Sequence, residues 1–191
     1  MFKKFQWIIT LKDEKPILDS TSLNKFFLKS YDPELGWLRK RGTAGIEKGA
    51  KENVSYNIDA IGSRVNSNNL VFDSTIACFG DSYAFCRQVN NDETFEYYLS
   101  ELLKTGVLNF GVGNYGLDQS LLYYKRTSLP SSVKTIIMVI VPETICRIQS
   151  YWKHYLEFGN TFAFKPKFIL KNKQLILQKN PMQNKNDFFN Y

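Results

Sequence analysis

The sequence has little histidine and little cysteine, which limits the kinds of site it can hold. Among 191 residues there is one histidine, His154, and there are three cysteines, Cys78, Cys86 and Cys146. The cysteine spacings match no metal site, so we expect neither a metal nor a cofactor. An odd number of cysteines also implies no disulfide framework, which predicts a reducing compartment such as the cytoplasm. Cys78, in an apolar run, is expected to be a small buried hydrophobe.

The sequence also lacks a long apolar segment and a dense cluster of one charge. Its N-terminal apolar run, residues 5–10, is followed by Lys12 and is too short for a secretory core or a membrane span. The formal net charge is +7, but the lysines are scattered. We therefore interpret the charge mainly as favouring solubility and expect no nucleic-acid partner, with a polyanionic or glycan-phosphate partner as the weaker alternative.

The remaining composition is that of one globular domain. Hydrophobic residues make up 43% and charged residues 23% of the chain, which is ordinary for a soluble protein. We predict an irregular N-terminal extension over residues 1–70, packed on an α/β domain over residues 71–191. Within the latter, residues 142–191 form an insertion or a lid-like segment. The oligomeric state is left open.

A regular pattern begins after residue 74. Apolar runs with strand character alternate with helical spacing and short turns, which predicts a parallel α/β sheet with right-handed connections. The last apolar run is expected to be a central strand that is buried on both faces. The predicted elements are strands 75–79, 107–110 and 134–141, and helices 91–104 and 117–127, the first helix carrying Phe95, Tyr98, Leu99 and Leu102 on one face.

The flanking segments are less regular. The predicted elements before residue 71 are a capped helix at 22–28, a loop at 31–37, an exposed loop at 41–54 and an edge strand or extended arm at 56–64. After residue 142 we predict a helix at 145–158, a β-hairpin formed by 168–170 and 175–177, and a tail at 181–191 with no closing helix or strand.

Three loops follow the three predicted strands at one edge of the sheet, where open α/β sheets bind ligands. They are Gly80-Asp81-Ser82, the glycine-rich turn 111–116, and Pro142-Glu143-Thr144. The first supplies a hydroxyl nucleophile. In the second, glycine lets backbone N–H groups approach a ligand closely, where they can stabilise an oxyanion. Together the loops favour acyl transfer over an ordinary set of turns.

Residues 76–82, the glycine-rich loop and Asp118-Gln119 together resemble the SGNH (GDSL) hydrolases, most closely bacterial members with polysaccharide and surface-glycan functions. The resemblance covers roughly residues 31–147. It implies a three-layer α/β/α, flavodoxin-like parallel sheet. It also implies a serine-dependent ester hydrolase or acyl transferase that acts on an O-acylated carbohydrate or another small ester.

The resemblance also implies site residues. Ser82 matches the nucleophile and contributes one oxyanion N–H, and Asp81 shapes the turn. The second oxyanion donor matches Asn114, with Gly113 just before it, and asparagine tolerates the left-handed backbone better than most residues. Where the family has an asparagine after the third strand, this chain has Glu143, whose carboxylate cannot donate a hydrogen bond.

The catalytic base is missing from the matched positions. The family takes it from an Asp-x-x-His loop near the C-terminal end, whereas His154 has Tyr151 three residues before it. We interpret His154 as a packing or surface residue, because geometry must qualify a base first. Either the chain is a fragment without its last strand, helix and Asp-x-x-His loop, which the tail favours, or it is a degenerate member that binds glycans or assists assembly without hydrolysis.

For three further patterns we prefer a structural interpretation to a functional one. Glycines 111, 113 and 116 match half of a dinucleotide fingerprint, but Asp118 would bring an acid to the phosphate position. The aromatic residues between 151 and 168 are expected to form core or a partner interface, and a lid or sugar-stacking platform is the functional alternative. Arg147 and Glu143 are expected to form a surface ion pair.

Overall fold

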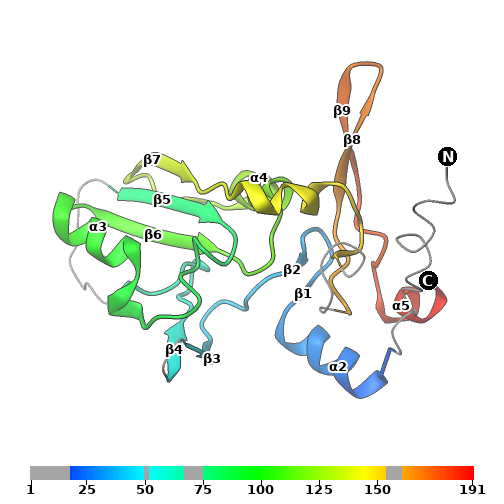
Figure 1. Ribbon diagram of the computed structural model, residues 1–191, viewed down its shortest axis with the longest axis horizontal. Helices are drawn as coiled ribbons and strands as arrows, with labels where there is room; N and C mark the ends of the chain where they lie inside the picture. Colours follow the sequence, from blue (N-terminus) through cyan, green and yellow to red (C-terminus); the bar gives the residue numbers. More distant parts are fainter. Residues whose placement is uncertain (1–17, 50–51, 67–74, 154–160) are drawn as a thin grey trace, which may run out of the picture.

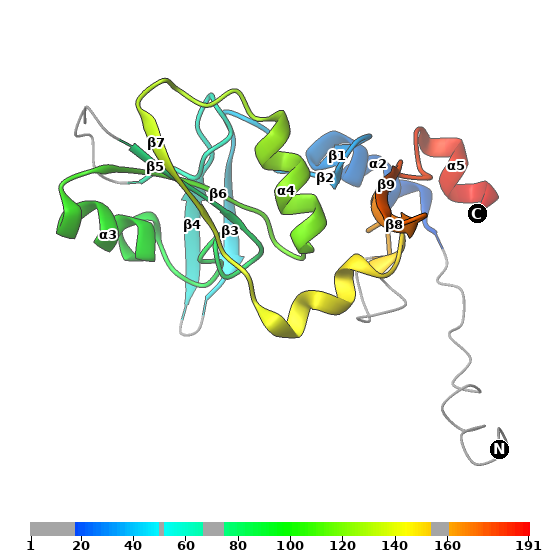
Figure 2. The same ribbon diagram turned by 90° about the horizontal axis from the view of Figure 1, so that it is seen from above.

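The computed structural model describes residues 18–49, 52–66, 75–153 and 161–191. Two lobes are visible in Figures 1 and 2, with helix α4 (Leu117–Arg126) between them. One lobe contains a parallel sheet. The other contains helix α2 (Ser20–Lys29), helix α5 (Lys185–Asn190) and a projecting hairpin. No helix in the described ranges has the length and apolar composition to cross a membrane.

The sheet has three parallel strands in the order β6-β5-β7. They are β5 (Thr75–Gly80), β6 (Gly106–Gly111) and β7 (Val133–Met138). Helix α3 (Phe95–Leu103) packs on β6, and α4 packs on β5. The protein is therefore a mixed α/β structure with a parallel sheet flanked by helices. This agrees with the predicted β-α-β-α-β order.

The predicted position of the last strand was wrong. The central strand is β5, whose residues are almost all buried, whereas β7 lies at the edge of the three-stranded sheet. Ile136 on β7 is 37% exposed, and Ile140 just beyond it is 61% exposed. Strand order depends on the direction of each crossover, and a continuous apolar run does not encode that direction.

Helix α3 forms as predicted, with Thr94 as its N-cap, but its apolar face points away from the sheet. Tyr98 is 61% and Leu102 is 80% exposed, while Glu96 and Ser100 are buried. The face toward β6 is thus partly polar, which places a carboxyl group in the interior.

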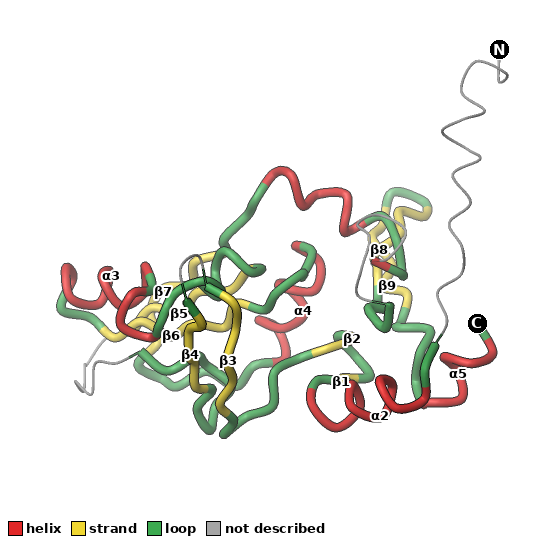
Figure 3. The backbone as a smooth tube through the Cα atoms, turned by 60° about the horizontal axis from the view of Figure 1, so that its bottom comes forward, coloured by secondary structure: helices red, strands yellow, loops and turns green. Residues whose placement is uncertain are grey.

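The N-terminal segments form two hairpins where loops were expected. One is the short pair β1 (Tyr31–Asp32) and β2 (Gly36–Trp37). The other pairs β3 (Ala44–Lys48) with β4 (Asn53–Asn57), so the prediction of an exposed loop at 41–54 was wrong. Figure 3 shows β3 and β4 side by side. Most side chains of this second hairpin remain exposed, and its polar composition therefore resembles that of a loop. The predicted arm after it is anchored by a bridge from Arg64 to Asn109 of β6.

The C-terminal hairpin is confirmed as β8 (Lys167–Lys171) and β9 (Gln174–Gln178). The predicted helix at 145–158 was wrong in its described part, because a 3-10 helix, η3 (Pro142–Ile148), ends at residue 148. The tail does form a helix, α5, contrary to prediction. It packs in the second lobe and not on the sheet (Figure 1).

Two hydrophobic cores hold these elements. The first lies at the sheet, where the rings of Phe79 and Phe110 stack at 4.8 Å. The second joins segments far apart in the sequence and contains Leu23, Trp152, Phe164, Met182 and Phe188. The described aromatic residues near Trp152 are therefore mainly core, as expected.

Candidate active site

The loops after the three strands meet at one edge of the sheet. The Val112 N–H donates to the Gly80 carbonyl (3.0 Å), and the Val139 N–H donates to the Phe79 carbonyl (2.8 Å). Gly80 and Gly111 form the last residue pair between β5 and β6. A Cβ atom on Gly111 would lie 2.2 Å from the Phe85 nitrogen, so only glycine allows the turn after β5 to pack this closely.

Asp81 shapes the turn that carries Ser82. Its buried carboxylate accepts the Tyr83 N–H at 2.9 Å, and its carbonyl accepts the Phe85 N–H at 3.0 Å. An aspartate that binds the N–H two residues ahead is a common turn-forming device. Ser82 itself is half-buried and lines a hollow of about 430 Å³ with Cys86, Arg87 and others. Its hydroxyl makes no hydrogen bond to any residue in the described ranges.

A buried arginine ties this turn to the other two loops. Arg147 of η3 places Nη1 3.4 Å from the Asp81 carboxylate and donates to the Tyr115 carbonyl at 3.1 Å. The predicted surface pair between Arg147 and Glu143 was therefore wrong. Arg147 is 8% exposed, whereas Glu143 is exposed and forms no ion pair with the described residues. No hydrogen bond joins Glu143 to Ser82 in the part of the chain that the structure describes.

Side chains and the backbone anchor the glycine-rich loop, but the N–H groups at its tip, those of Gly113 and Asn114, are left without a partner among the described residues. The Trp37 indole donates to the Gly113 carbonyl at 3.0 Å, and the Tyr115 hydroxyl donates to the Trp37 carbonyl at 2.5 Å. Asn114 has a φ of 67°, the left-handed geometry that asparagine was expected to tolerate. The N–H groups of Gly113 and Asn114, like that of Ser82, donate to no residue that the structure describes.

Ser82 and Asn114 lie in adjoining hollows and not in a single cavity. Gly113 and Asn114 line a cavity of about 340 Å³ against Trp37, and Ser82 lines the other hollow. Arg87 lines both. The sequence-predicted residues are thus brought to one edge of the sheet, with Arg87 between the two hollows.

No base for Ser82 is identified among the described residues. His154 lies outside them, and the Tyr151 hydroxyl donates to Gln178 of the hairpin. Glu93 lines the Ser82 hollow, but its carboxylate accepts the Asn90 N–H at 2.8 Å. Within the described part of the chain, no three metal-ligating side chains are grouped to hold an ion.

Glu96 is a buried carboxyl group next to the Ser82 turn that the sequence did not reveal. It is 1% exposed, and the Cys86 thiol lies 3.5 Å from its Oε2. Burial raises the pKa of Glu96 to about 8, despite hydrogen bonds and the nearby Arg64 charge. In the sequence, Glu96 occupies the first turn of a predicted helix, where acidic residues are common and were expected to be exposed to solvent.

Asp118 and Gln119 act as structural anchors. Asp118 is buried and forms an ion pair with Lys165, whose Nζ also donates to the Pro166 carbonyl at 3.0 Å. Burial lowers the pKa of Lys165, although Asp118 opposes this. Gln119 donates to the Leu35 carbonyl at 2.7 Å and accepts the Gly116 N–H at 3.2 Å. These bonds fix the start of α4. They also occupy the Gly116 N–H, which a nucleotide phosphate would need.

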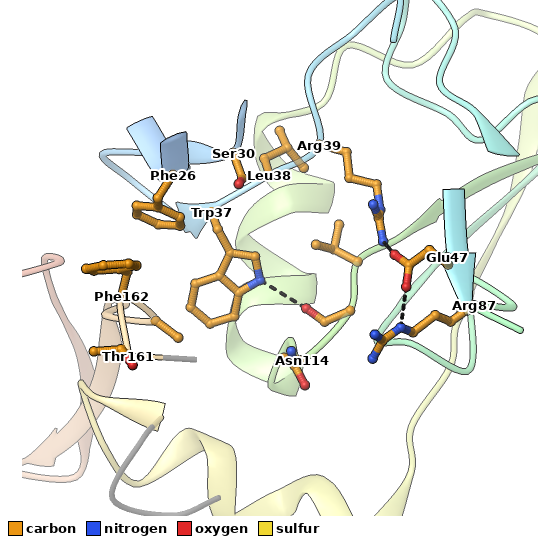
Figure 4. Close-up of a pocket in the computed structure, with 13 residues that line it drawn as sticks. Phe26, Ser30, Trp37, Leu38, Arg39, Glu47, Arg87, Asn114, Thr161 and Phe162 are labelled. Carbon is orange, nitrogen blue, oxygen red and sulfur yellow. Dashed lines mark hydrogen bonds and ion pairs between the residues drawn. The ribbon is translucent and has the colours of Figure 1, made fainter. Parts of the chain in front are cut away.

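A charged triplet that was not predicted lies beside Asn114. Glu47 of β3 accepts hydrogen bonds from Arg39 and Arg87 and so bridges the two guanidinium groups (Figure 4). Burial raises the pKa of Glu47, but the bonds and charges of the two arginines outweigh it, so the pKa lies below its usual value. Forty positions separate Arg87 from Glu47, and no local pattern links them.

Comparison with known proteins adds no family to this description. No protein-family model matches the chain, and no curated protein sequence matches it.

Proposed function

We propose that the chain is a serine-dependent ester hydrolase or acyl transferase of the SGNH type that acts on an O-acylated carbohydrate. The observation that carries the proposal is the combination at the sheet edge. Ser82 lies two residues after the end of the central strand, and its hydroxyl and the N–H groups of Ser82, Gly113 and Asn114 have no partner among the described residues.

The topology supports the same proposal. The order β6-β5-β7 corresponds to the first three strands of the flavodoxin-like order 2-1-3-4-5. In that arrangement ligands bind at the carboxyl ends of the strands, beside the point where the strand order reverses. This point lies between β5 and β7, next to the turn that carries Ser82. The three-layer α/β/α arrangement is part of the proposal, as is a cytoplasmic location, which is based on the free cysteines.

In the proposed reaction the Ser82 Oγ attacks the acyl carbonyl carbon. The N–H groups of Ser82 and of Asn114 or Gly113 hold the oxyanion of the tetrahedral intermediate. The ester C–O bond to the sugar then breaks, the sugar oxygen takes a proton, and the acyl group stays on Ser82. Water releases it in hydrolysis, and a second alcohol accepts it in transfer. A general base must take the Ser82 proton, since an unactivated hydroxyl is a weak nucleophile.

A second candidate function is a non-catalytic glycan-binding or assembly module on the same fold. The observation that favours it is the absence of a base hydrogen-bonded to Ser82 among the described residues. The two candidates differ in whether Ser82 reacts.

Labelling with a fluorophosphonate separates them. The enzyme is expected to take the label on Ser82, identified by peptide mass spectrometry, and to hydrolyse 4-nitrophenyl acetate. Ser82→Ala is expected to lose both while keeping its thermal unfolding midpoint. Ser131→Ala, at an exposed position before β7, is the matched control and is expected to label like the parent chain. Equal labelling of the Ser82→Ala variant would reject the nucleophile. No labelling of either chain would favour the binding module.

A further inference from the structure

A cavity of about 340 Å³ lies beside the glycine-rich loop, and its walls differ in chemistry. One wall is aromatic and is formed by Phe26, Trp37 and Phe162 (Figure 4). The rings of Phe26 and Phe162 stack at 5.6 Å with an interplanar angle of 25°. The volume of the cavity lies near the lower end of the range for small-molecule sites, about 300–1,000 Å³. Such a space suits a single ring with one apolar face.

The opposite wall is polar and carries more positive than negative charge. Two guanidinium groups, of Arg39 and Arg87, share the single carboxylate of Glu47. Arg39 is held between the rings of Tyr56 (4.3 Å) and Phe85 (4.1 Å), which fixes its position. Its Nε is buried and has no hydrogen-bond partner among the described residues.

Arg87 supplies the donors for a ligand. Only its Nε is engaged, by Glu47, and its two terminal nitrogens bond to no residue in the described ranges. The side chain is 54% exposed, so these donors are accessible. Because Glu47 holds the guanidinium in place, less side-chain freedom is lost when an anion binds.

We propose that this cavity binds one ring of an anionic sugar, with the ring against the aromatic wall and its carboxylate or phosphate on Arg87. The inference deepens the function proposed above and rests on it for the choice of a sugar. A sugar ring presents an apolar C–H face and a polar edge, which match the two walls. A planar guanidinium binds carboxylate and phosphate oxygens in pairs, so the anion sets the orientation of the ring.

The cavity adjoins the residues that are proposed to catalyse the acyl transfer. Gly113 and Asn114 line the cavity, and Arg87 also lines the Ser82 hollow. A sugar bound here therefore lies next to the loop that is proposed to hold the oxyanion. Its acylated oxygen would point toward Ser82, on the far side of Arg87.

The test is calorimetric titration of the full chain with glucuronate, glucose 6-phosphate and glucose. At least one of the two anions is expected to bind about tenfold more tightly than glucose, the effect of one charge-assisted hydrogen bond. The stronger of the two identifies the anion as carboxylate or phosphate. Arg87→Gln is expected to abolish this preference, and Arg87→Lys to keep part of it as a point charge. Lys104→Gln, which removes a charge that is 72% exposed at the C-cap of α3, is the matched control and is expected to bind like the parent.

Two outcomes would overturn the proposal: equal affinity for glucose and both anions, or an unchanged preference in Arg87→Gln with an unchanged unfolding midpoint. Titration of Ser82→Ala separates this inference from the esterase proposal. Retained anion preference together with an absence of fluorophosphonate labelling would reject the enzyme and keep the sugar site. Labelling of Ser82 without anion preference would support the enzyme and reject the sugar site.

Discussion

Arg147 and Asp81 form an ion pair that is almost completely enclosed, although 66 positions separate them in the chain. Their side chains are only 9% and 5% exposed. Because the same guanidinium also binds the Tyr115 carbonyl, it links η3 to the loops after β5 and β6. The arrangement of the candidate site therefore depends on a residue outside both loops.

The first prediction concerns removal of this guanidinium. Arg147→Met leaves the buried Asp81 carboxylate without its ion-pair partner, so we expect the free energy of unfolding to fall by about 3 kcal/mol or more. Urea unfolding measures this change. Reaction of the folded variant with fluorophosphonate should also slow, because the Ser82 turn loses a support.

The control for this prediction is an ion pair with the same N–O distance that lies on the solvent-exposed surface. Lys104 and Glu101 are also 3.4 Å apart, but their side chains are 72% and 40% exposed. Exposed pairs contribute little to stability, so Lys104→Met should leave the urea midpoint almost unchanged. A loss as large as that of Arg147→Met would contradict the importance of burial.

The second prediction compares two glycines of the same loop. Gly111→Ala would place a Cβ atom 2.2 Å from the Phe85 nitrogen, a backbone atom that cannot yield. We expect a loss of about 3 kcal/mol, at the upper end for overpacking. Gly113→Ala meets no atom within 4 Å and has no positive φ, so its stability should change little. Thermal unfolding of both variants is the measurement, and similar midpoints would refute the close contact between the loops.

Local features were predicted well from the sequence. Strand β5 and the Gly80-Asp81-Ser82 turn each depend on a few neighbouring residues, and the left-handed backbone that asparagine was expected to tolerate is found at Asn114. Their residue types carry the structural preference directly, which is why the sequence sufficed.

Long-range relationships were not predicted, because they depend on packing between distant segments. The edge position of β7 follows from crossover directions, and the hydrophobicity of the strand is the same in either place. The Arg147–Asp81 pair and the bridge of Glu47 to Arg87 join residues on different elements. The charge of Glu96 was visible in the sequence, but not the inward direction of its helix face.

The third prediction tests which atoms of Asn114 act. Glycine adopts a φ of 67° without cost, so Asn114→Gly should keep both stability and the hydrolysis of 4-nitrophenyl acetate if the backbone N–H is the donor. Asn114→Ala should lose about 1 kcal/mol, since alanine is strained in this region. If the side-chain amide is the oxyanion donor instead, Asn114→Gly should lose about 100-fold or more in kcat.

The fourth prediction uses the pH dependence of stability. Burial holds the pKa of Glu96 at about 8 in the folded protein, above the value of 4.5 expected when the chain is unfolded. Between these values the unfolded carboxyl group is ionised and the folded one keeps its proton. Unfolding therefore releases a proton, and the free energy of unfolding falls as the pH rises, by up to about 1.4 kcal/mol per pH unit.

Glu96→Gln should remove this contribution, because the amide has a similar shape and does not titrate. We expect its free energy of unfolding, measured in urea between pH 5 and 8, to fall less steeply than that of the parent chain, with the largest gain in stability near pH 8. Asp92→Asn removes an exposed carboxylate of η2 (Asn91–Glu93), and its profile should run parallel to that of the parent. Cys86, Arg64 and Asn109 surround Glu96 in all three proteins. Burial, followed by the nearby Glu96, raises the pKa of Cys86 to about 12, so in the folded protein this thiol keeps its proton across the range from pH 5 to 8. A Glu96→Gln profile parallel to that of the parent would show that this carboxyl group is already ionised at pH 5.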